Sequence, residues 1–144
     1  MAAPLPAYVA PAVFEKVRRA FCEALELEPH EVTWDARVLD DLDAESLDLL
    51  DVVFRLEQAF DVQIPRGGIE ARAKEAEGEE PGQVNGRLTA TGARKLAEIM
   101  PEVPPGEIFE GMKTAEIPRV FRVLTFYNIV TALMKAKELG IETT

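Results

Sequence analysis

The segment from Ser46 to Phe60 constrains the fold most strongly, because it carries apolar residues on two sides of one helical period. The wider stripe has the i, i+3, i+4, i+7, i+11 spacing of a helix that faces a core, and the narrower stripe has i, i+3, i+7 spacing. Acids border the narrower stripe, which predicts an apolar seam with an acidic rim. A small bundle that buries both stripes is the alternative. The wider stripe comprises Leu49, Val52, Val53, Leu56 and Phe60; the acid-rimmed seam comprises Leu47, Leu50 and Phe54, with Asp48, Asp51 and Glu57 at its rim.

Helical periodicity also runs through most of the remaining chain, and no segment shows sustained strand alternation. A first helix ends before Pro29, and a long loop from Glu28 to Glu45 precedes the helix that begins at Ser46. Thr89 is placed to cap a further helix that stops at Pro101. The predicted fold class is therefore all-α. Two more helices are predicted, a short one over residues 117–123 and a final one over residues 126–139 with Thr125 as its cap.

A chain of 144 residues is long enough for one compact domain and short for two. Residues 66–87 hold 5 of the 9 glycines and few large apolar residues, which predicts a flexible loop. Residues 88–113 regain apolar residues and predict a helical insertion. The chain is therefore expected to be a single domain over residues 1–144 with an extra helical segment.

Negative charge is concentrated in one part of the chain. The formal net charge is −10, and eight acids face a single base between Asp40 and Asp61. Such a density repels nucleic-acid phosphates and favours steering toward basic protein surfaces. An acidic face kept only for solubility is the alternative.

The chemistry-bearing residues exclude most enzyme classes. The single cysteine leaves no intramolecular disulfide, and one cysteine with one histidine leaves no Cys or His metal cluster. His30 lies in a Pro-His-Glu turn at no usable spacing for a serine–histidine pair. A calcium loop starting at Asp41 fails, because Ser46 stands where glycine is needed and Val52 where glutamate is needed. We therefore expect no metal and no catalysis. No apolar run spans a membrane and the N-terminus lacks the charge pattern of a secretory signal, so we expect a cytoplasmic protein.

The stretch LEPHEVTWDARVLDDLDAESLDLLDVVFRLEQAFDVQIP, residues 27–65, resembles the acyl carrier protein family. In that family a loop with spaced valine and aspartates leads to Asp-Ser-Leu and then to an acidic helix that ends before Ile-Pro. The C-terminal stretch LTFYNIVTALMKA is similar to the last helix of the family. Glu45 stands where the family usually has aspartate, and Asp43 where glycine is common.

The resemblance implies that the Ser46 hydroxyl carries a 4'-phosphopantetheine arm through a phosphodiester, with the acyl group held as a thioester on the terminal thiol. A phosphopantetheinyl transferase would attach the arm. Ketosynthases and other enzymes of fatty acid, polyketide or lipid synthesis with basic docking patches would receive the acyl group. The implied docking residues are Glu45, Leu47, Asp48, Leu50, Asp51, Phe54 and Glu57, and the implied acyl-cavity lining is Leu49, Val52, Val53, Leu56 and Phe60.

The resemblance also implies a four-helix bundle that is split by the insertion. Residues 12–65 and 114–140 would form the carrier core. Residues 88–123 carry many large apolar side chains, Ile99 and Phe109 among them, which is too much apolar surface to leave in water. We therefore expect this segment to fold onto the carrier core and to enlarge or cover the acyl cavity. Filling the gap opened by the split is the alternative role. We expect a monomer. The alternative function is an unmodified scaffold protein that keeps the fold and the acidic face.

Overall fold

The computed structural model describes residues 4–64, 83–138 and 140. It is mostly helical, which confirms the expected helical bundle with an extra helical region. The chain forms two compact units. The split unit consists of Met1–Pro65 with Arg122–Thr144, and the inserted unit is Arg66–Phe121.

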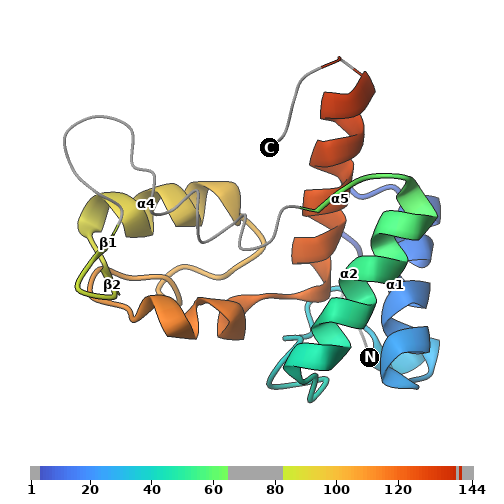
Figure 1. Ribbon diagram of the computed structural model, residues 1–144, viewed down its shortest axis with the longest axis horizontal. Helices are drawn as coiled ribbons and strands as arrows, with labels where there is room; N and C mark the ends of the chain where they lie inside the picture. The colour runs from blue at the N-terminus through green and yellow to red at the C-terminus, as the bar shows by residue number, and fades with distance from the viewer. Residues whose placement is uncertain (1–3, 65–82, 139, 141–144) are drawn as a thin grey trace. The chain divides into compact units, whose positions relative to one another are not determined.

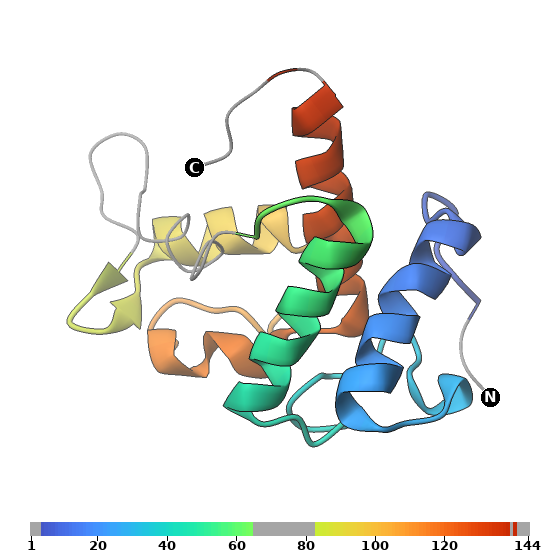
Figure 2. The same ribbon diagram turned by 45° about the vertical axis from the view of Figure 1, so that its right-hand side comes forward.

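Three α-helices build the described part of the split unit: α1 (Pro11–Leu25), α2 (Ser46–Phe60) and α5 (Val123–Glu138). Each packs against the other two (Figure 1, Figure 2). A short 3-10 helix, η1 (Pro29–Glu31), lies on the connection between α1 and α2. The side chains that are almost fully buried in this unit are Phe14, Val17, Phe21, Val32, Val38, Val52, Leu56, Val123, Leu124 and Val130.

Contacts distant in sequence close this unit. The rings of Phe21 in α1 and Phe126 in α5 meet edge to face at 5.4 Å, a favourable aromatic geometry. The backbone N–H of Ala10 donates to the Tyr127 hydroxyl at 2.8 Å. At the other end, Lys137 Nζ lies 2.7 Å from a carboxylate oxygen of Asp61, the C-cap residue that follows α2. The N-terminal helix and the C-terminal helix are thus held together although the insertion separates them in sequence.

The inserted unit contains a β-hairpin that the helical periodicity did not predict. Strands β1 (Gln83–Val84) and β2 (Arg87–Leu88) pair antiparallel. The turn residues Asn85 and Gly86 both have positive φ, 54° and 74°, the backbone of a two-residue hairpin turn. The expected flexible loop over residues 66–87 is therefore wrong for its last five residues, and residues 66–82 lie outside the described residues.

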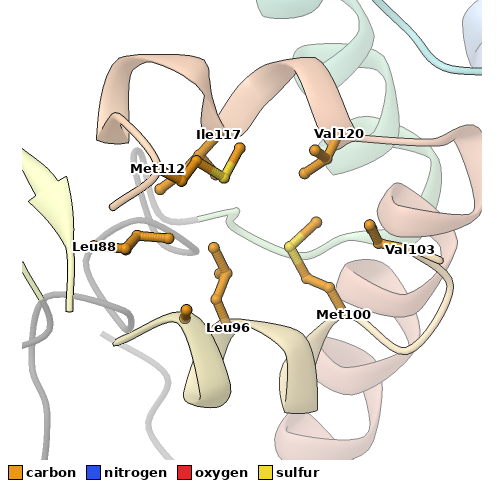
Figure 3. Close-up of a cluster of buried hydrophobic side chains, with 8 residues drawn as sticks. Leu88, Leu96, Met100, Val103, Met112, Ile117 and Val120 are labelled. Atoms are coloured by element: carbon orange, nitrogen blue, oxygen red, sulfur yellow. The ribbon is translucent and has the colours of Figure 1, made fainter. Parts of the chain in front are cut away.

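Helix α4 (Ala90–Ile99) follows the hairpin and has the predicted cap, because Thr89 Oγ1 accepts the N–H of Gly92 at 3.0 Å. A 3-10 helix, η2 (Thr114–Val120), closes the inserted unit. Side chains from the hairpin, α4, the following loop and η2 converge on one another (Figure 3). The buried members of this cluster, here called the inserted core, are Leu88, Ala93, Leu96, Met100, Val103, Met112, Ile117 and Val120.

The inserted core changes two expectations. The expectation that residues 88–123 cover an acyl cavity depended on their needing the carrier bundle to bury their apolar side chains. The buried side chains of the inserted core pack against one another, so their burial does not require the bundle. Ile99 and Phe109, which were also expected to be buried, are 40% and 51% exposed.

Two predicted boundaries near the return to the split unit are also wrong. The predicted short helix over residues 117–123 is η2, and its Ile117 and Val120 belong to the inserted core, so the carrier core resumes at residue 122 and not at 114. Helix α5 begins at Val123, three residues before the prediction. Thr125 lies inside it, and its Oγ1 accepts the N–H of Arg122 at 2.9 Å.

Candidate functional site

Ser46 is the first residue of α2, as predicted, and its side chain is exposed. The helix is capped by the preceding residue, Glu45. Glu45 and Asp48 form a reciprocal capping box, in which the N–H of Glu45 donates to Asp48 Oδ2 at 2.9 Å. Within the described part of the chain, no residue forms a hydrogen bond with Ser46 Oγ. A serine at a helix start is usually consumed as a cap, and here the hydroxyl is left available.

The loop before Ser46 is held in place by its backbone and by the ion pairs of Arg37 with Asp40 and Asp41. The N–H groups of Val123 and Leu124 donate to the carbonyls of Ala36 and Trp34 at 3.1 and 3.0 Å, which joins the loop to the start of α5. Farther along, the Arg37 guanidinium donates to both carboxylate oxygens of Asp41, at 3.0 and 3.3 Å. Its backbone N–H donates to the same carboxylate at 2.9 Å.

These interactions have an electrostatic consequence. The hydrogen bonds from the Arg37 side chain and, secondarily, from its backbone hold the pKa of Asp41 below the ordinary value of an aspartate. These three hydrogen bonds are here called the Arg37–Asp41 clasp. The sequence did not predict it, because i, i+4 spacing brings two side chains together on a helix and these residues lie in a loop. It constrains the loop only a few residues before Ser46.

Asp43 stands where glycine is common in the family that the sequence resembles. Its φ is 57°, in the left-handed region where residues with a Cβ are disfavoured. Aspartate is one of the few residues that tolerate this region. The turn is followed by the buried Ala44, so the chain enters α2 with Glu45 and Ser46 facing solvent.

The acid-rimmed seam of α2 is a solvent-exposed surface. Leu47, Leu50 and Phe54 are 77%, 47% and 60% exposed, so the alternative in which the bundle buries both stripes is wrong. Large apolar side chains this exposed on one helical face mark an interaction site more often than a free surface. The seam runs from the residue next to Ser46 along two turns of α2.

The rim acids are partly committed within the fold. Asp48 accepts the N–H of Glu45, and Asp51 Oδ1 accepts from Arg55 Nε at 2.9 Å. Glu57 Oε2 accepts the N–H of Ile64 at 2.8 Å. All three side chains are half-buried, and each carboxylate keeps a second oxygen. They therefore combine a structural role with the negative charge beside the seam.

The opposite stripe of α2 faces the core. Val52 and Leu56 are fully buried, whereas Leu49, Val53 and Phe60 are half-buried. The structure thus places the five residues of the expected acyl-cavity lining on the inward side of the helix. Lys16 of α1 lies with its ammonium 5.5 Å from the Phe60 ring centre, where the aliphatic stem can cover the ring.

Side chains of the kinds that bind metal ions do not cluster among residues 4–64, 83–138 and 140. Within these ranges no three His, Cys, Asp or Glu side chains are close enough to hold a metal ion. Cys22 is half-buried, and burial raises the pKa of its thiol, which keeps it protonated. None of the described helices is long and apolar enough to cross a membrane. The feature that offers chemistry is the exposed Ser46 hydroxyl.

Comparison with known proteins agrees with this geometry. The family described as "Phosphopantetheine attachment site" matches residues 15–68, which include most of α1, the loop and all of α2. Beyond residue 68 the inserted unit lies outside this match. No solved structure matches the chain significantly.

Three acyl carrier proteins illustrate the similarity. The chain is 40% identical over 62 residues to that of Sulfurovum sp. (strain NBC37-1), covering 43% of this chain and 83% of that protein. It is 43% identical over 54 residues to that of Campylobacter concisus (strain 13826), covering 38% and 70%. It is 43% identical over 53 residues to that of Borreliella burgdorferi (strain ZS7), covering 37% of this chain and 66%, just under two thirds, of that protein. The chain therefore belongs to the acyl carrier protein family.

Proposed function

We propose that this protein holds acyl intermediates as thioesters on a 4'-phosphopantetheine arm attached to Ser46. Members of the family are carriers and not catalysts. The observation that carries the assignment to this residue is the exposed Ser46 hydroxyl, freed from capping by the Glu45–Asp48 box. Ser46 is also the only serine in the chain.

The residues around Ser46 fit a phosphodiester. The first backbone N–H groups of a helix have no partner within the helix, and the positive end of its dipole lies there, so α2 favours an anion at its first residue. The neighbouring Glu45 and Asp48 oppose added negative charge, but their carboxylates are engaged in the capping box. When bound, the arm supplies the thiol that forms the thioester. The chain supplies the hydroxyl and holds the loop before it through the Arg37–Asp41 clasp.

The acid-rimmed seam is the proposed docking face for the phosphopantetheinyl transferase and for ketosynthases and other acyl-processing enzymes. Its exposed leucines and Phe54 offer apolar anchors, and its rim suits basic patches on those enzymes. The seam begins next to Ser46, so a protein that binds it also meets the attachment point. The proposed recipients are enzymes of fatty acid, polyketide or lipid synthesis, and Leu49, Val52, Val53, Leu56 and Phe60 are the proposed shelter for the acyl chain.

Intact-mass measurement tests the attachment. Co-expression with a broad-specificity phosphopantetheinyl transferase should add the mass of one arm to the wild-type chain and nothing to Ser46→Ala. A Thr89→Ala variant serves as a matched control, because it removes a side-chain hydroxyl at a different helix start. It should accept the arm as wild type does.

An unchanged wild-type mass with several transferases would refute the carrier role. It would favour the unmodified scaffold instead. Addition of the arm to Ser46→Ala would show that another group is the acceptor. Circular dichroism of Ser46→Ala should match wild type, since the hydroxyl bonds to no described residue.

A further inference from the structure

The inserted unit has an open surface pocket of about 330 Å³, lined by residues that lie outside the family match. It lies between strand β2 and helix η2. Its lining residues are Arg87, Phe109, Gly111, Met112, Lys113, Glu116 and Arg119.

The pocket is basic on an acidic chain. Three cationic side chains line it against the single carboxylate of Glu116, whereas the chain as a whole has a net charge of −10. Arg87 is fixed at one side, because its Nη1 donates to the Gly111 carbonyl at 2.9 Å. Arg119 pairs with Glu116 at 2.8 Å. Within the described residues, no carboxylate pairs with the exposed Lys113 ammonium.

An apolar anchor completes the pocket. Phe109 is 51% exposed, and the neighbouring Met112 is only 5% exposed, so a ring available to a partner adjoins a buried apolar side chain. The backbone around it is well tied: Leu88 N–H donates to the Met112 carbonyl at 2.8 Å, and Gly111 N–H donates to the Leu88 carbonyl at 2.8 Å. An exposed aromatic side chain with a cationic rim on a fixed backbone is typical of a protein-binding surface.

The acid-rimmed seam of α2 has the complementary properties. It presents exposed apolar side chains with carboxylates around them, where the pocket presents an exposed ring with cations around it. Apolar contact with opposite charges at the rim is the arrangement that gives specific association. We propose that the basic pocket of one copy of this protein binds the acid-rimmed seam of a second copy.

Each copy carries one pocket and one seam, so the contact joins unlike surfaces. Each contact leaves one pocket and one seam open, so further copies can add and extend a chain. The surfaces are small and the charges are exposed, which makes the contact weak. The protein is then a monomer at low concentration, as expected from the sequence, and associates as concentration rises. A copy whose seam is covered cannot present it to a transferase or a ketosynthase.

Sedimentation velocity on the full-length protein tests the proposal with three variants. Lys113→Glu reverses a pocket charge, Phe54→Gln removes a seam anchor, and Arg94→Glu reverses an exposed charge of the inserted unit outside the pocket. Lys113→Glu and Phe54→Gln should each weaken association by roughly three- to tenfold, as expected for a rim charge or an exposed contact. Arg94→Glu should associate as wild type does.

Mixing supplies the decisive measurement. An equimolar mixture of Lys113→Glu and Phe54→Gln should associate more strongly than either variant alone, because one supplies an intact seam and the other an intact pocket. A wild type that stays monomeric into the millimolar range, an Arg94→Glu effect equal to that of Lys113→Glu, or a mixture no stronger than its components would overturn the proposal. None of these results bears on arm attachment, which the mass measurement at Ser46 tests separately.

Discussion

Replacing Leu96 with alanine tests whether the inserted unit is stabilised by its own core. Leu96 is fully buried in that core, and truncating such a side chain costs about 2 to 5 kcal/mol, including the cavity that it leaves. A unit formed by residues 66–121 has roughly 3 to 8 kcal/mol of unfolding free energy in total. We therefore expect Leu96→Ala to remove about half or more of the stability of the inserted unit.

Urea unfolding followed by two signals separates the units. The chain has one tryptophan, Trp34, and it lies in the split unit, so its fluorescence reports on that unit. Far-UV circular dichroism reports on the helices of both units. With a denaturant dependence of about 1 to 3 kcal/mol per molar urea, the loss should move the midpoint of the inserted unit by about 1 to 5 M. In Leu96→Ala we expect an early phase in circular dichroism and an unchanged Trp34 midpoint.

Ile99→Ala is the matched control, because Ile99 lies on the same helix but is 40% exposed. It should cost about 1 kcal/mol or less. If the Trp34 midpoint fell as far as the circular dichroism midpoint, the two units would unfold as one and the reasoning would be refuted. Equal losses from Leu96→Ala and Ile99→Ala would contradict the burial argument.

Three further outcomes concern the split unit. The double variant Asp48→Asn, Asp51→Asn keeps an acceptor oxygen at each rim position but removes the charge. Its association with a basic partner enzyme, measured by stopped flow at low salt, should therefore slow far more than that of Glu98→Gln. Equal slowing would exclude a localised docking face. Asp41 has a lowered pKa in the folded state, so its ionised carboxylate stabilises the folded protein. This contribution is complete above the ordinary carboxyl pKa of about 3.9 and is lost as the pH falls through the lower pKa of the folded state. The difference in unfolding free energy between wild type and Asp41→Asn should therefore shrink in acid, and a constant difference would contradict this. At the positive φ of Asp43, Asp43→Gly should change the unfolding free energy by about 1 kcal/mol or less in thermal unfolding. Asp43→Val should lower it by roughly 1 to 2 kcal/mol or more, because a β-branched residue disfavours this backbone conformation. A stabilising valine would show that φ at this position is not constrained.

Helix α2 could be predicted with its exact bounds because its signals are local. The spacing of Val52 and Leu56 against Leu50 and Phe54 separates a buried face from an exposed one, and the structure has that separation. The same periodicity failed at Ile99. On α4 the apolar spacing alone does not show which side of the helix the hairpin and η2 cover.

The hairpin was missed although its turn carries a recognisable signal. Asn85-Gly86 is a favoured pair for a two-residue hairpin turn, but strands of two residues are too short to show alternation. The capping role of Glu45 was also hidden, because Ser46 beside it is a commoner cap type. The basic pocket has no sequence signature, since Arg87 and Arg119 meet only through the fold of the inserted unit.

The hydrogen bonds that tie the inserted unit to itself also affect how the split unit assembles. Helix α5 packs against α1 although the whole insertion lies between them in sequence, and Tyr127 contacts Ala10. Contacts so distant in sequence slow folding. Within the insertion, the Thr114 N–H donates to the Gly86 carbonyl at 2.9 Å. Once the insertion is folded, residues 87–113 no longer add to the length of the loop that must close between α2 and α5. This roughly halves the chain length between α2 and α5 that closure must order, worth about 0.6 kcal/mol of loop entropy. An insertion that folds before α5 packs against α1 thus lowers the entropy cost of joining the two parts of the carrier.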